Sequence, residues 1–295
     1  MSKNSKTIRT IGLFGKYGSR DVGSVIERLC ALMRERDLKV LLEEATADFM
    51  DLVCAESRPL DRIGEDIDLA IVVGGDGTML HVARSLARHG VPLIGVNLGR
   101  LGFLTDISTD RMVEDLNHIL DGDFETEERI LLEAEVVRDG KVLHAANALN
   151  DVVVNKGQLA RLIEFETWVD DEFVSSTRAD GIIIATPTGS TAYALSAGGP
   201  ILHPTLPAIV IVPICPHTLS DRPLAVGSDS RIEIVMTSTS QQSAHVTLDG
   251  QTNFSIQDYD RVRVRRADRA VTLIHPKRRN HYDVLRAKLR WGEKI

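Results

Sequence analysis

Cysteine and net positive charge are scarce in this chain of 295 residues. The three cysteines, Cys30, Cys54 and Cys215, are odd in number and far apart in the sequence. Their spacing predicts neither a disulfide framework nor a metal site, and it favours a reducing compartment. The formal net charge of −7 argues against non-specific electrostatic binding of nucleic acid or of an acidic membrane. An anionic ligand would therefore have to bind in a local pocket.

Long apolar runs are also missing. No run approaches the roughly 20 residues of a membrane span, and the N-terminal stretch MSKNSKTIRTIGLFG lacks the apolar core of a signal peptide. The hydrophobic fraction of 43% is nevertheless enough for ordinary cores in a chain of this length. These features predict a folded cytoplasmic protein of about two domains.

Strand-like and helix-like segments alternate over residues 1–123. An apolar segment at 8–15 precedes a stretch whose apolar residues share one helical face, and the same order repeats through residues 69–86. The helical face consists of Val22, Val25, Ile26, Leu29, Leu32 and Met33. Such alternation is typical of a parallel sheet with helices on its faces and ligands at the carboxyl ends of its strands. We therefore predict a Rossmann-like α/β domain over residues 1–123.

Residues 124–275 have a different pattern. Short strand-like segments follow one another with turn signals between them, which predicts an antiparallel β domain. Within it, the run GSTAYALSAGGP at 189–200 reads as a helix closed by its glycines and proline. Residues 276–295 contain a short helical pattern that we expect to pack back on the first domain. The chain as a whole is predicted to be α+β.

The loop GGDGT at 74–78 joins a buried strand to a helix. A tight turn with Asp76 as the helix N-cap would explain one glycine. Three glycines exceed that need, because each costs roughly 0.5–1 kcal/mol relative to alanine. Glycines let backbone amides at a helix start approach an anion, while neither a P-loop lysine nor a GxGxxG pattern is present. We predict a phosphate loop of another kind, with Asp76 handling a proton or a metal, made of Gly74, Gly75, Gly77 and Thr78.

Two further clusters carry polar side chains. Asn150 and Asp151 stand just before an apolar run, and an Asn-Asp pair taken alone is more typical of a structural turn than of a binding site. The segment TRADGIIIATPTGSTAYALSAGGP at 177–200 combines hydroxyls, small residues and a predicted helix start. These suit the ribose and phosphates of a nucleotide, although a capped loop rich in glycine and threonine is the structural alternative.

Taken together, these segments resemble the NAD kinase family. GGDGT at 74–78, the Asn150-Asp151 pair, TPTGSTAYALSAGGPI at 186–201 and DGQ at 249–251 stand in the family's order, and the likeness covers nearly the whole chain. The GGDGT loop alone also fits diacylglycerol and sphingosine kinases, so TPTGSTAY is the discriminating part. The resemblance is to the bacterial form that uses ATP, and it implies an α/β domain followed by a β-sandwich that binds the dinucleotide.

The resemblance implies transfer of the γ-phosphoryl group of ATP to the 2′-hydroxyl of the adenosine ribose of NAD, which gives NADP. Asp76 would orient this hydroxyl and accept its proton, and a divalent ion, expected to be Mg²⁺, would bridge the phosphates without a dedicated protein cage. Family members are commonly homodimers or homotetramers. The implied NAD-binding residues are Asp76, Gly77, His81, Asn150, Asp151, Arg161, Arg178, Asp180, Thr191, Ala192, Tyr193, Ala194, Leu195, Ser196 and Gln251.

Two other functions stay open at this point. A lipid kinase of the diacylglycerol kinase type would share the GGDGT loop, but it would need an apolar pocket or a membrane-binding surface, whereas the residues after Asp180 are small and hydroxylated. A nucleotide sensor without catalysis would bind the same ligands, and the presence of Asp76 argues against it. His81 and Arg161 also have plain alternatives, as a packing histidine and as a surface arginine.

Overall fold

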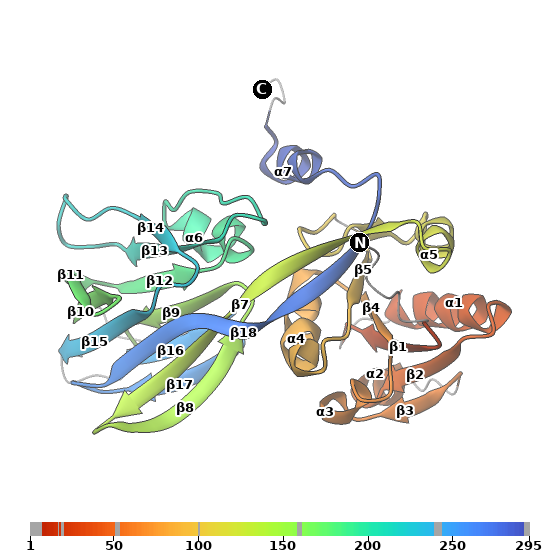
Figure 1. Ribbon diagram of the computed structural model, residues 1–295, viewed down its shortest axis with the longest axis horizontal. Helices are drawn as coiled ribbons and strands as arrows, with labels where there is room; N and C mark the ends of the chain where they lie inside the picture. Colours follow the sequence, from red (N-terminus) through yellow and green to blue (C-terminus); the bar gives the residue numbers. More distant parts are fainter. Residues whose placement is uncertain are drawn as a thin grey trace. The chain divides into compact units, whose positions relative to one another are not determined.

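The computed structural model describes residues 8–16, 18, 21–50, 54–99, 101–157, 161–238 and 244–291. The chain forms two compact units, which Figure 1 shows in sequence colours. Unit 1 comprises Met1–Glu128 and Val271–Ile295, and unit 2 comprises Arg129–Ala270. Both boundaries fall inside strands, because the chain leaves unit 1 within β7 (Phe124–Arg138) and returns within β18 (Arg261–Pro276). Among the described residues, no helix is long and apolar enough to cross a membrane.

Unit 1 contains the predicted parallel sheet. Its strands lie in the order β5-β4-β1-β2-β3, and every neighbouring pair is parallel. The end of β18 adds a strand that the sequence did not lead us to expect here, since Leu273 pairs in parallel with Leu93 of β5. The bounds are β1 (Thr10–Gly15), β2 (Lys39–Glu43), β3 (Glu56–Arg58), β4 (Leu69–Val73), β5 (Leu93–Asn97) and β6 (Ile107–Ser108), which pairs with β5.

Helices cover both faces of this sheet. α1 (Asp21–Glu35) buries the whole predicted apolar face and shares a core with α5 (Met112–Leu120) and with Ile94 and Val96 of β5. Side chains alternate between the faces of a strand, so Gly95 faces the other way. Met79 of α4 (Asp76–Leu86) lies 2.8 Å from the place of a Cβ on Gly95, which puts α4 on that second face. The shorter helices are α2 (Glu44–Met50), α3 (Leu60–Ile63), η1 (Ala87–His89) and, near the C-terminus, α7 (His281–Leu289).

Unit 2 contains two antiparallel sheets that share one hydrophobic core, which is the arrangement of a β-sandwich. Phe165, Ile234 and Val262 reach this core from one sheet, and Val152 and Ile184 reach it from the other. The first sheet has the order β11-β10-β15-β18, with β7 pairing both β18 and β8, and the second has the order β14-β13-β12-β9-β16-β17. Their bounds are β8 (Lys141–Ala148), β9 (Asp151–Asn155), β10 (Ile163–Val169), β11 (Glu172–Ala179), β12 (Gly181–Ala185), β13 (Ala208–Ile214), β14 (Leu224–Gly227), β15 (Ile232–Ser238), β16 (Ala244–Leu248) and β17 (Thr252–Ile256).

The helical run expected at 189–200 is split in two. The structure has a 3₁₀ turn, η2 (Gly189–Thr191), and a single turn of α-helix, α6 (Tyr193–Ser196). Ala192 between them has φ −102° and ψ −125°, which lies outside the helical region. Its N–H nevertheless donates to Gly189 O and closes the first turn. The run ends as expected at a glycine, since Gly198 has φ +88°.

Two of the cysteines lie much closer together in the fold than in the sequence. Cys30 and Cys54 are far apart in the chain, yet their Sγ atoms lie 2.6 Å apart as free thiols. Cys30 is buried on α1, and Cys54 precedes β3, so the fold of unit 1 brings them together. Burial, and after it the hydrogen bond with Cys54, raises the pKa of the Cys30 thiol to about 12.

Candidate functional site

The GGDGT loop connects β4 to α4. Gly75 is the N-cap of α4 and Asp76 is the first helical residue, so the carboxylate of Asp76 does not cap the helix. Gly74 has no room for a side chain, because a Cβ there would lie 2.6 Å from Thr78 Oγ1. Gly75 and Gly77 face open space instead. Their lack of a side chain leaves the backbone at the start of α4 accessible to a ligand.

The carboxylate of Asp76 is fixed by a second loop, residues 101–106, which follows β5. Asp76 Oδ2 accepts a hydrogen bond from Phe103 N, and Oδ1 accepts one from Leu104 N, both at 2.9 Å. This loop closes on itself, since Gly102 N donates to Thr105 O at 2.9 Å. Two backbone donors therefore set the orientation of the carboxylate, which remains partly exposed.

A cavity of about 600 Å³ lies beside the same loop in unit 1. Gly75, Gly77 and Thr78 line it, together with Lys16 and His81. His81 reaches solvent, but partial desolvation, followed by the positive charge of Arg84, lowers its pKa below 6.5. Lys16 was missed at the sequence level, although it follows β1 at the edge where a parallel sheet binds its ligands.

In unit 2, Asp249 organises the turn that carries Asn150 and Asp151. Its carboxylate accepts three backbone hydrogen bonds, from Leu149 N at 2.9 Å, Asn150 N at 2.7 Å and Asp151 N at 3.1 Å. Asp249 N in turn donates to Asp151 O at 3.0 Å. The structure thus places the DGQ segment, with Gln251, next to the Asn-Asp pair. Asp249 itself was not among the residues predicted to act.

The carboxyl group of Asp151 has an unusual environment. Asp151 is buried, with 5% of its surface exposed. Burial, and after it the negative charge of Asp249, raises the pKa of the Asp151 carboxyl from 3.8 to about 7. A perturbed carboxyl beside a turn of polar residues is typical of a ligand-binding site, although structural sites show it too.

The TPTGSTAY segment packs against the same turn. Thr186 N donates to Asn150 O at 2.9 Å, and Gly189 lies so close to Asn150 O that no side chain would fit. Along 191–196, the side chain of Ala194 is buried in a core, whereas Tyr193 is 46% exposed. The other predicted residues of this run are Thr191, Ala192, Leu195 and Ser196, which are partly or fully exposed.

The remaining predicted residues are Asp180, Arg178 and Arg161. Asp180 precedes β12 and pairs with Lys156 at 2.5 Å. Asp151 lies opposite Ala185, which is five residues after Asp180, so the α-carbons of Asp151 and Asp180 are about 16 Å apart along the strand direction. Arg178 on β11 is exposed and lies 3.5 Å from Glu164, and Arg161 is exposed.

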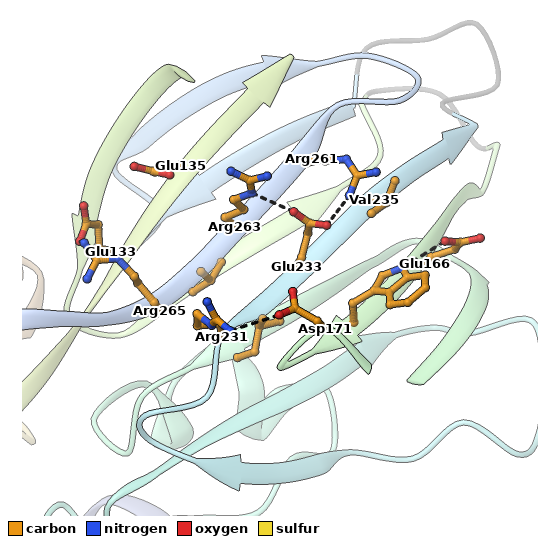
Figure 2. Close-up of a pocket in the computed structure, with 13 residues that line it drawn as sticks. Glu133, Glu135, Glu166, Asp171, Arg231, Glu233, Val235, Arg261, Arg263 and Arg265 are labelled. Carbon is orange, nitrogen blue, oxygen red and sulfur yellow. Dashed lines mark hydrogen bonds and ion pairs between the residues drawn. The ribbon is translucent and has the colours of Figure 1, made fainter. Parts of the chain in front are cut away.

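A second cavity of about 600 Å³ lies on one face of the first sheet of unit 2, the sheet that contains β15 and β18, as Figure 2 shows. Its charged side chains pair with one another across the strands. Glu233 of β15 bonds both Arg261 and Arg263 of β18, and Arg231 lies 3.2 Å from Asp171. Arg261, Arg263 and Arg265 alternate along β18, and all three are about half exposed. This face brings together none of the predicted site residues.

Within the described ranges, no three His, Cys, Asp or Glu side chains are arranged to hold a metal ion. Asp76 contributes a single carboxylate, whose two oxygens already accept backbone hydrogen bonds. Any divalent ion in this region would have to take most of its ligands from substrate phosphates and water, as Mg²⁺ commonly does.

Comparison with known proteins covers nearly the whole chain. The family model of the ATP-NAD kinase N-terminal domain matches residues 23–124, and that of the ATP-NAD kinase C-terminal domain matches residues 149–276. The chain is 49% identical over 286 residues to an NAD kinase from Thiobacillus denitrificans, covering 97% of this chain and 98% of that protein.

Two solved structures share the fold. A yeast NADH kinase in complex with NADH has a TM-score of 0.88 and 25% identity, covering 99% of this chain and 90% of that chain. An NAD kinase from Archaeoglobus fulgidus in complex with ATP has a TM-score of 0.75 and 25% identity, covering 94% of this chain and 99% of that chain. None of these similarities supports a lipid kinase or a non-catalytic sensor.

Proposed function

The chain belongs to the NAD kinase family and phosphorylates NAD to NADP, and we propose that Asp76 is the catalytic base of this reaction, with ATP as the phosphoryl donor. The observation that carries the proposal is the fixed Asp76 carboxylate at the start of α4, whose neighbours Gly75 and Gly77 line a cavity.

Asp76 has the chemistry that the step requires. Phosphoryl transfer has a loose transition state, so the protein mainly positions the reactants and stabilises charge. An ionised carboxylate has about four acceptor positions; the amides of Phe103 and Leu104 use two of them, and the Thr105 hydroxyl donates more weakly to Oδ1 at 3.4 Å. Asp76 therefore keeps an acceptor position, on Oδ2, for the 2′-hydroxyl of the adenosine ribose. It orients this hydroxyl and accepts its proton as the oxygen attacks the γ-phosphorus.

The phosphates of ATP fit the cavity next to Asp76. The start of α4 offers backbone amides and the positive end of the helix dipole, and the glycines leave this surface uncovered. Lys16 lines the same cavity and adds a positive charge. Mg²⁺ bound to the phosphates would neutralise part of their charge. Gly74 and Thr78 maintain the loop, and His81 lies one turn further along the cavity wall.

The polar turn of unit 2 is proposed to bind NAD. Asn150 has an amide that hydrogen-bonds the adenosine end, and Asp151 and Gln251 lie on the segments beside it. Residues 191–196 supply hydroxyls and backbone groups, and Ala194 can offer only its backbone. Arg161, Arg178 and Asp180 complete the proposed set. The proposal further includes a cytoplasmic homodimer or homotetramer, which cell fractionation and light scattering test.

The test is Asp76→Asn in a coupled assay of NADP formation from NAD, ATP and Mg²⁺. Loss of a positioned acid–base group lowers kcat by about 10²–10⁴, whereas KM for ATP changes little because the glycines remain. Asp21→Asn is the matched control, since Asp21 is likewise the first residue of a helix and lies outside the site. Turnover near that of the wild type in a folded Asp76→Asn protein would remove Asp76 from its role.

A further inference from the structure

The backbone of Phe103 connects Asp76 to the C-terminal segment of unit 1. Its N–H donates to Asp76 Oδ2 at 2.9 Å, and its carbonyl accepts a hydrogen bond from Arg279 Nη2 at 3.1 Å. The two partners bond opposite ends of one residue's backbone. A single residue therefore links Arg279 to the carboxylate of Asp76.

Arg279 is itself held by two acidic side chains. Its Nη1 lies 2.7 Å from Glu127 Oε2, and its Nε lies 2.8 Å from Asp106 Oδ2. His275 packs between the same two acids: its Nδ1 hydrogen-bonds Asp106 Oδ2 at 2.8 Å, while its Nε2 is only near Glu127 Oε2, at 3.3 Å. The Arg279 side chain is 11% exposed and that of Asp106 is 6% exposed, so water screens these charges poorly. The cluster consequently gives the guanidinium a defined position.

Asp106 also belongs to the loop that holds Asp76. The loop is thus fixed at Phe103 and at Asp106 by the same arginine. A further contact comes from α7, where Lys288 Nζ lies 5.8 Å from the centre of the Phe103 ring. The C-terminal segment therefore contacts this loop through the Phe103 carbonyl, the Phe103 ring and Asp106.

We propose that Arg279 is a positioning residue for catalysis: by holding the Phe103 carbonyl and Asp106, it fixes the loop whose amides orient the carboxylate of Asp76. The inference rests on the proposed role of Asp76. It goes further because it assigns a catalytic consequence to a residue that is not in the proposed substrate-binding set and does not line the cavity beside Asp76. The competing explanation is that Arg279 only attaches the C-terminal segment.

Arg279→Lys tests the inference with the charge retained. An ammonium group lacks the planar fork that reaches Asp106, Glu127 and the Phe103 carbonyl at once. The expected result is a fall in kcat of about 10- to 100-fold, the scale for a small misplacement of a catalytic group, with KM for NAD and for ATP within about twofold. Arg278→Lys is the matched control, because Arg278 pairs with the buried Asp115 of α5 and should leave kcat unchanged.

A double-mutant cycle separates positioning from attachment. If Arg279 acts through Asp76, adding Arg279→Lys to Asp76→Asn lowers kcat no further, because the group to be positioned has gone. Equal factors in both backgrounds would overturn the inference, as would an unchanged kcat in Arg279→Lys alone. A wild-type rate in Asp76→Asn would instead refute the proposed function. If Arg279→Lys does not fold, the same cycle with Glu127→Gln, which keeps the guanidinium but loosens one of its partners, gives the same decision.

Discussion

Replacing Asp151 with asparagine should stabilise the protein at alkaline pH far more than at acidic pH. Asp151 is buried, and burial followed by the charge of Asp249 raises its pKa from 3.8 to about 7. In the unfolded chain the carboxyl group releases its proton near its ordinary value. Between these two pH values, the unfolded chain is ionised while the folded protein still holds the proton. The stability that the neutral carboxyl contributes is therefore fully present below about pH 4 and is lost as the pH rises through about 7.

The size of the effect follows from the same two values. The difference between 3.8 and about 7 is about 3 pH units, and at 1.36 kcal/mol per unit this corresponds to about 4 kcal/mol of lost stability above pH 8. At pH 5 the loss is less than half of that. Asparagine cannot ionise, so the free energy of unfolding of Asp151→Asn should rise relative to the wild type by about 2–3 kcal/mol between pH 5 and pH 8.

Urea unfolding of both proteins at pH 5 and pH 8 measures this change, and comparing the two pH values cancels effects of the new side chain that do not depend on pH. Asp170→Asn is the control with the opposite sign, since a backbone hydrogen bond from Arg231 lowers the pKa of Asp170. Asp170 is ionised in both states at pH 5 and pH 8, so its variant should keep a constant difference from the wild type. A constant difference for Asp151→Asn as well would refute the reasoning.

Two further substitutions test the site. Gly102→Ala would place a Cβ against Asp76 Oδ1 and Thr105 Oγ1, so the loop at 101–106 has to shift. Its kcat should fall, with a smaller change in KM for either substrate, in steady-state assays; Gly99→Ala, where a Cβ meets open space, is the control. Asn150→Ala should weaken NAD by about 1–3 kcal/mol, the cost of leaving a buried polar partner unpaired. Calorimetry should find ATP affected much less, and equal losses would indicate a structural turn.

Local patterns in the sequence were enough to predict the layers of unit 1. The apolar face of α1 repeats every three to four residues, and all of its predicted members are buried. The GGDGT loop lies between β4 and α4 because an apolar run of strand length precedes it and a helical pattern follows it. These patterns extend over about a dozen residues, so they can be recognised in the sequence without knowledge of the tertiary structure.

The interactions that orient the site could not be predicted in this way. Asp249 bonds the backbone of Leu149 across 100 positions, and Arg279 bonds that of Phe103 across 176. Almost every residue has the same backbone N–H and C=O groups, so the residue type at a position does not reveal which of these groups will accept or donate a long-range hydrogen bond. Asp249 is visible in the sequence as part of the DGQ motif. Its hydrogen bonds to the turn at 149–151 nevertheless depend on β16 lying beside β9. The contact between Cys30 and Cys54 depends in the same way on how α1 packs.

The question that the GGDGT loop raises, namely why a carboxylate stands among glycines in a loop that suits anions, has a geometric answer. Gly75 and Gly77 line the cavity, whereas the carboxylate of Asp76 accepts hydrogen bonds from the loop at 101–106. Two amide donors offset part of its negative charge, which reduces its repulsion of phosphates next to it. One turn of chain can therefore present amides to the proposed phosphate and a base to the proposed hydroxyl, provided that the second loop stays in place.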